Sequence, residues 1–264
     1  MNVYDETYDC LMQTDISQKK ICINSLYLNW KAGKLSRDES SDPMRTEIPG
    51  RPDKPELISP SKLKQRKLGS ELGRATLIHA IAHIEFNAIN LALDAVYRFR
   101  DMPDDYYADW LKVASEEAYH FSLLDNRLQA MGYEYGQFPA HNGLWEMVLK
   151  TDRDVLIRMA LVPRVLEARG LDVTPGMMQR LEKTGDSETV DILKIILRDE
   201  IGHVAIGSRW FKYCCGLQNV EPEATFRGLL HEYMGGSLRG PFYTEGRLQA
   251  GFTQDEIDEL VKMT

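Results

Sequence analysis

The chain has 264 residues, of which 43% are apolar, so it can bury a sizeable core in one large domain, with room for an appendage. Its net charge of -8 argues against indiscriminate binding to nucleic acid or to anionic membranes. The first fourteen residues carry several acids and no apolar core segment, which excludes a secretory signal there, and we expect a cytoplasmic protein.

Residues 1–69 are predicted to be an extension of short helices followed by a proline-rich wrap. Prolines recur between Pro43 and Pro60, and each removes a backbone donor and favours extended chain. A short basic run, Lys62–Lys67, then leads into the main domain. We interpret this run as solvated charge, although it could also contact phosphates.

Residues 70–216 show helical periodicity and are predicted to form an all-α, ferritin-like four-helix bundle with a long crossover between its second and third helices. Pro103 ends the first helix, and Gly170 is expected to end the third. Residues 217–264 are expected to form a helical tail that packs on the bundle. The predicted main helices span approximately residues 70–100, 104–132, 152–168 and 187–215, with a short separate helix over 175–183.

The most apolar window of the chain covers residues 75–96 and lies in the first bundle helix. It contains His79, His83, Glu85 and Asp94, which are costly to place in a bilayer. We therefore expect no membrane span.

Two stretches of the chain carry a Glu-x-x-His motif, at Glu117–His120 and at Glu200–His203. Side chains at i and i+3 share one face of a helix, so each pair can hold a single metal ion. One further glutamate lies in an apolar helical run before each motif: Glu85 is 32 residues before Glu117, and Glu167 is 33 before Glu200. Charged residues are rarely buried unless they are paired or bound to metal. The order predicts a two-metal site built from two helical hairpins.

The predicted ligands are four carboxylates and two imidazoles, which suit iron or manganese better than a thiolate-preferring metal. We expect two metal ions, with iron preferred and manganese as the alternative. Glu116 and Asp199 lie four residues before the motif histidines and can turn off the metal face. They are predicted to orient a ligand histidine through its other ring nitrogen, with a solvent-facing position as the alternative.

Several neighbouring residues have less specific predictions. His79 and His83 lie off the Glu85 face of their helix and should miss the metal. Pro163 should kink the third helix near Glu167, either opening a cavity or simply being tolerated. His141 lies in the crossover, where we favour a packing role, with a place in a lid as the alternative. Arg164 and Arg169 are expected to pair with acids or to bind an anionic substrate.

The four cysteines are Cys10, Cys22, Cys214 and Cys215, and no Cys-x-x-C motif occurs. Scattered cysteines in an acidic chain fit a reducing cytosol. We predict thiols without special chemistry.

Five strings of residues carry a resemblance to a known family: 79–85, 116–121, 138–145, 158–172 and 199–204. At these positions the chain resembles the ferritin-like family catalogued as domain of unknown function 455, over approximately residues 45–260. The resemblance implies a ferritin-like bundle with metal ligands at Glu85, Glu117, His120, Glu167, Glu200 and His203. It implies no established reaction. The layout is also distantly similar to bacterial tRNA hydroxylases and other di-iron oxygenases, a likeness of fold alone.

The leading hypothesis for function is a di-iron or manganese–iron oxidoreductase that activates dioxygen to oxidise or hydroxylate a small organic substrate. No G-x-G-x-x-G fingerprint occurs, so electrons should come from an external donor. The alternatives are a ferroxidase or iron-handling protein, an RNA-modifying hydroxylase that uses the basic run, and a metal-free bundle. The sequence is compatible with a homodimer and does not specify the substrate, the donor or the oligomeric state.

Overall fold

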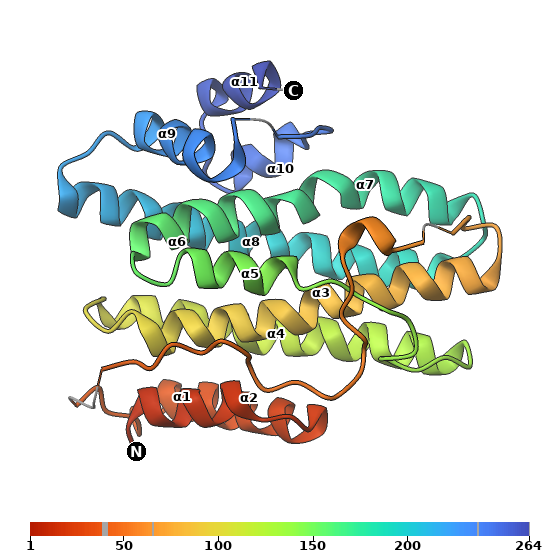
Figure 1. Ribbon diagram of the computed structural model, residues 1–264, viewed down its shortest axis with the longest axis horizontal. Helices are drawn as coiled ribbons and strands as arrows, with labels where there is room; N and C mark the ends of the chain where they lie inside the picture. The colour runs from red at the N-terminus through yellow and green to blue at the C-terminus, as the bar shows by residue number, and fades with distance from the viewer. Residues whose placement is uncertain (39–41, 65, 237, 264) are drawn as a thin grey trace. The chain divides into compact units, whose positions relative to one another are not determined.

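The computed structural model describes residues 1–38, 42–64, 66–236 and 238–263 (Figure 1). The fold is an all-α helical bundle fold, as predicted, and the described residues form no strand beyond two isolated backbone bridges. The chain divides into two compact units, Met1–Leu149 (unit 1) and Lys150–Thr264 (unit 2). The domain boundaries predicted from the sequence, at 69/70 and 216/217, do not coincide with this division and remain predictions.

Unit 1 is centred on a long helical hairpin of α3 (Glu71–Arg98) and α4 (Asp104–Ala130) (Figure 1). The Ser70 side chain caps α3 by accepting from the Gly73 N–H, and Asp104 and Asp105 place negative charge at the N-terminus of α4. Helix α1 (Val3–Met12) packs on α3, and α2 (Ile16–Lys31) packs on α4. Residues 42–59 form no helix and lead to the short 3-10 turn η1 (Pro60–Lys62), as the prolines predict.

Helix α3 is long and apolar enough, by length and composition alone, to cross a membrane. However, 78% of its most apolar window is buried inside the structure, which is the pattern of a core helix in a soluble protein. His79, Glu85 and Asp94 lie within this buried stretch. The prediction of a core helix rather than a membrane span therefore agrees with the packing.

Unit 2 carries two long helical segments. The first runs through α6 (Val155–Leu161), a π-helical turn η2 (Val162–Glu167) and α7 (Ala168–Glu182). The second is α8 (Ser187–Gln218), which packs against all three parts of the first (Figure 1). Three shorter helices complete the unit, and α9 packs on α6 and α8: α9 (Pro222–Met234), α10 (Thr244–Gln249) and α11 (Gln254–Lys262).

The helix boundaries differ from the sequence prediction at three places. Gly170 does not end the third helix, because α7 continues through it and through Pro175 to Glu182. The buried side chains of Leu171 and Asp172 hold this stretch against the rest of unit 2, which outweighs the local cost of glycine and proline. The sequence analysis also missed α5 (Gly143–Lys150) in the crossover and α10 in the tail.

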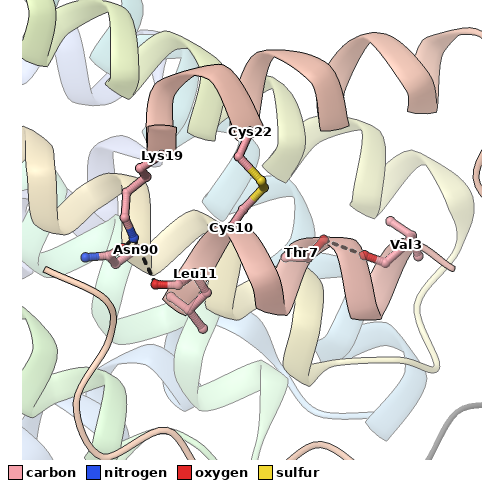
Figure 2. The surroundings of a disulfide bond; sticks show 7 residues. All are labelled: Val3, Thr7, Cys10, Leu11, Lys19, Cys22 and Asn90. Carbon is pink, nitrogen blue, oxygen red and sulfur yellow. Dashed lines mark hydrogen bonds between the residues drawn. A yellow bond between two sulfur atoms is a disulfide. The ribbon is translucent and has the colours of Figure 1, made fainter. Parts of the chain in front are cut away.

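The prediction of thiols without special chemistry is wrong for two of the four cysteines. Cys10 in α1 and Cys22 in α2 form a disulfide that joins the two N-terminal helices (Figure 2). They lie 12 residues apart, and only the antiparallel packing of α1 and α2 brings their Cα atoms to 5.6 Å. Cys214 and Cys215 are free and buried, as predicted.

Candidate metal centre

Unit 1 brings three of the predicted ligands together inside the α3–α4 hairpin. Ligand atoms of Glu85, Glu117 and His120 lie within 4.8 Å of one another. The Nδ1 atom of His120 is 3.2 Å from Glu85 Oε2 and 3.5 Å from Glu117 Oε2. All three side chains are buried, and Glu117 and His120 are fully so. This buried group of carboxylates and imidazole could bind a metal ion, which confirms the coarse form of the prediction.

The electrostatics of His120 show how strongly the two carboxylates act on it. Burial alone would lower the pKa of this imidazole, but hydrogen bonds and charge interactions with Glu117 and Glu85 outweigh burial and raise the pKa to about 11. A metal cation bound between the carboxylates and the imidazole would compete with the proton of His120, because the same two carboxylates favour either charge.

Unit 2 contains the second set of predicted ligands. Glu200 and His203 lie on one face of α8, with 3.6 Å between His203 Nδ1 and Glu200 Oε1. This distance is close to the 3.5 Å between the corresponding atoms of Glu117 and His120. Glu167 is the last residue of η2, and all three side chains are buried. The i, i+3 geometry predicted for both motifs is therefore present in each helix.

The turn that carries Glu167 is not a regular α-helix. Pro163 has no backbone N–H to donate to the carbonyl of Met159, so the α-helical hydrogen-bond pattern is interrupted and the chain widens into a π-helical turn. The Pro163 ring packs against Gly207 of α8 so closely that a Cβ atom on Gly207 would lie 2.2 Å from Pro163 Cγ. The kink expected from Pro163 takes this form.

A buried arginine anchors the same turn to the C-terminal helices. The guanidinium of Arg164 is surrounded by the rings of Phe211, Phe226 and Phe252, at 4.8, 4.2 and 4.4 Å from their centroids. Its Nη2 atom donates to Glu256 Oε1 at 2.5 Å. Of the two roles expected for Arg164, the structure therefore shows pairing with an acid.

Comparison with known proteins places the chain in a family. The family described as "Protein of unknown function (DUF455)" matches residues 12–258. The chain belongs to this family. An uncharacterized protein of Haemophilus influenzae is 49% identical over 219 residues, which cover 80% of this chain and 76% of that protein. No solved structure matches the chain.

The two acids predicted to orient ligand histidines lie near the motifs but show other contacts. Glu116 Oε1 forms an ion pair with Lys112 Nζ at 3.1 Å. Asp199 accepts hydrogen bonds from Arg198 Nε and Nη2 at 2.8 and 3.1 Å. Whether either acid also orients a histidine of this DUF455 chain remains a prediction.

The other histidines of the first bundle helix form a separate buried network in unit 1. His79 Nε2 accepts from the Gly136 N–H at 2.9 Å, and His83 contacts the Tyr135 hydroxyl at 2.9 Å and the His141 carbonyl oxygen at 3.1 Å. Burial lowers the pKa of both imidazoles to about 4. His79 and His83 thus lie away from the ligands, as expected. Sequence analysis missed Tyr135, which no local pattern marks.

Proposed function

We propose that this chain is a di-metal carboxylate oxidoreductase, with two iron ions or a manganese–iron pair, that activates dioxygen to oxidise or hydroxylate a small organic molecule. In this proposal the two motif pairs close one ferritin-like site. The observation that carries it is the buried cluster of Glu85, Glu117 and His120, whose ligand atoms lie within 4.8 Å of one another.

The chemistry of the donor set supports two metal ions. Glu85, Glu117, Glu167 and Glu200 together carry four negative charges when ionised, which match the charge of two divalent cations. Buried carboxylates without counter-charge are costly, so metal binding should couple to folding. Carboxylate oxygens and imidazole nitrogens suit iron and manganese.

The residues of the chain would have separable roles. Glu117 and His120 would hold one ion, Glu200 and His203 the other, while Glu85 and Glu167 would complete the coordination. When bound, the metal ions would supply the redox chemistry toward dioxygen. The buried helical surroundings would keep water away from the site, and an external reductase would provide the electrons.

Metal content tests the ligand set directly. Protein from native expression should contain about two equivalents of iron, or of iron plus manganese, by elemental analysis. Glu117→Ala and Glu200→Ala should each lose most of it, because each removes one ligand of a buried ion. Glu182→Ala, an exposed position at the end of α7, serves as the control. Full metal content in both ligand variants would contradict the assignment.

Reaction with oxygen tests the activity class. Anaerobic protein loaded with ferrous iron should show new optical absorption on exposure to oxygen, and this change should be absent in Glu117→Ala. A cage-sized particle in gel filtration would instead indicate iron storage. Protein that takes up no ferrous iron would indicate a structural bundle.

A further inference from the structure

We propose that unit 2 binds a small amphipathic organic anion, an acid group on a short apolar body, in a cavity beside η2. The cavity measures about 250 Å³ and lies between the η2–α7 segment and residues 238–242, which precede α10. A single water needs roughly 10–15 Å³ of such volume, so this space is large enough for an organic molecule. None of the six predicted metal ligands lines it.

The walls of the cavity combine apolar side chains with guanidinium groups. Val165, Leu166 and Phe242 contribute apolar surface, as do two further aliphatic side chains. Arg169, Arg239 and Arg247 also line it. Ligand pockets commonly have this composition, in which apolar walls bury the body of the ligand and a few polar groups fix its orientation.

The charge balance at the cavity is positive. Asp172 is the one acid among the described lining residues, and Arg247 already neutralises it: Arg247 Nε and Nη2 donate to its two oxygens at 2.9 and 2.7 Å. The backbone N–H of Tyr243 also donates to Asp172. The charges of Arg169 and Arg239 remain, in a chain whose net charge is -8. A negatively charged ligand would balance them.

The two remaining arginines are placed differently. Arg169 Nη1 donates to the carbonyl oxygens of Arg239 and Pro241 at 2.6 and 3.2 Å, which fixes its guanidinium against the wall formed by the α9–α10 segment. Arg239 is exposed, and its side chain forms no hydrogen bond or ion pair with the residues described. A planar guanidinium can donate two parallel hydrogen bonds to a carboxylate or a phosphate.

These features select against two simpler ligands. A bare inorganic anion would leave the apolar walls in contact with water. A neutral apolar molecule would cover the walls but leave two guanidinium charges without a partner. The ligand that satisfies both parts of the cavity carries an acid at one end and a short hydrocarbon body at the other.

Isothermal titration calorimetry on the full-length protein tests this site with hexanoate and hexyl phosphate as probes. At least one of the two should show saturable binding, and the tighter one identifies the acid group. Hexan-1-ol, which has the same body without charge, should bind at least about tenfold more weakly. Arg239→Ala should weaken binding of the anion by about tenfold. Arg180 is an exposed arginine of α7 outside the cavity, so Arg180→Ala should leave binding unchanged.

Several results would overturn the proposal. They are the absence of saturable binding by both anions, equal binding of hexan-1-ol, unchanged binding in Arg239→Ala, or equal weakening in Arg180→Ala. Because the exposed Arg239 side chain forms no hydrogen bond or ion pair with the residues described, and its carbonyl oxygen is kept in the variant, Arg239→Ala should remain folded. Metal content is measured separately, so failure here leaves the metal proposal untouched and the reverse also holds.

Discussion

Lys19 in unit 1 and Arg164 in unit 2 are buried cations that the protein holds by different chemistry. In unit 1, Lys19 of α2 is almost fully buried and donates to two neutral acceptors, Leu11 O at 2.8 Å and Asn90 Oδ1 at 2.7 Å (Figure 2). In unit 2, the buried Arg164 and Arg247 each pair with a carboxylate. Burial penalises the charged amine and lowers the pKa of Lys19 to about 7, since both of these hydrogen-bond acceptors are neutral.

The ligand-bearing helices of the two units also differ in regularity. Glu85 lies in the middle of α3, which is α-helical throughout, whereas Glu167 ends a π-helical turn. The spacing from the lone glutamate to its Glu-x-x-His motif is nevertheless 32 residues in one unit and 33 in the other. Nearly equal sequence spacing thus accompanies different local structures. We expect Lys19 and the disulfide to make unit 1 sensitive to pH and to redox conditions. We expect Arg164 and Gly207 to make unit 2 sensitive to the loss of one charge and to the crowding of one close contact.

The largest effect is expected from Arg164→Ala. This variant leaves Glu256 buried without its cation, and we expect a loss of about 3–5 kcal/mol in the free energy of unfolding, measured in urea. The double variant Arg164→Met, Glu256→Gln removes both charges and keeps the hydrogen bond by which residue 256 caps α11. It should recover most of the loss. A double variant as unstable as Arg164→Ala would show that the ion pair is not the cause.

Removing the disulfide of unit 1 should lower the free energy of unfolding by an amount similar to the effect of Arg164→Ala or smaller. The double variant Cys10→Ala, Cys22→Ala should lose about 2–4 kcal/mol, because it frees a short loop in the unfolded chain. Dithiothreitol should destabilise the parent protein by a comparable amount and leave the double variant unchanged. Equal stability of parent and variant in urea would show that helix packing alone holds α1 and α2 together.

The close contact between Gly207 and the Pro163 ring should make stability sensitive to a larger side chain at position 207. A Cβ atom there would overlap the Pro163 ring, so Gly207→Ala should cost about 1–3 kcal/mol and displace the turn that carries Glu167. Gly216→Ala is the matched control on the same helix, since nothing lies within 4 Å of its added Cβ. It should be neutral or stabilising by up to about 1 kcal/mol. Equal effects of the two substitutions on thermal unfolding would argue against the tight contact.

Per pH unit, the smallest effect is the pH dependence that Lys19 imposes on unit 1. Above pH 7 the folded protein loses this proton while the unfolded chain keeps it up to its ordinary pKa of 10.5. The unfolded state then binds more protons, so stability should rise with pH by up to about 1.4 kcal/mol per unit in this window. Below pH 7 the Lys19 amine is charged in both states, so the full cost of burying that charge lowers the free energy of unfolding.

Lys19→Met provides the comparison for this pH dependence. Urea unfolding of parent and variant at several pH values between 7 and 10 isolates the contribution of the amine. The difference in stability between the two proteins should change steadily with pH. Parallel pH curves for the two proteins would contradict a lowered pKa of Lys19.

The sequence by itself determined the helical class, the main helix positions and the two Glu-x-x-His faces. Each of these depends on local periodicity: apolar residues recur every three to four positions, and Glu117 and His120 share a face because they are three residues apart. Pro103 and the following aspartates marked the start of α4 for the same local reason.

Tertiary structure alone decided the remaining features. The Cys10–Cys22 bond depends on how two helices pack, and the continuation of α7 through Gly170 and Pro175 depends on buried contacts of its neighbours. The cavity beside η2 joins Arg169 to Arg239, which are distant in the chain. Such contacts depend on long-range packing that no short sequence window contains, so local periodicity could not predict them.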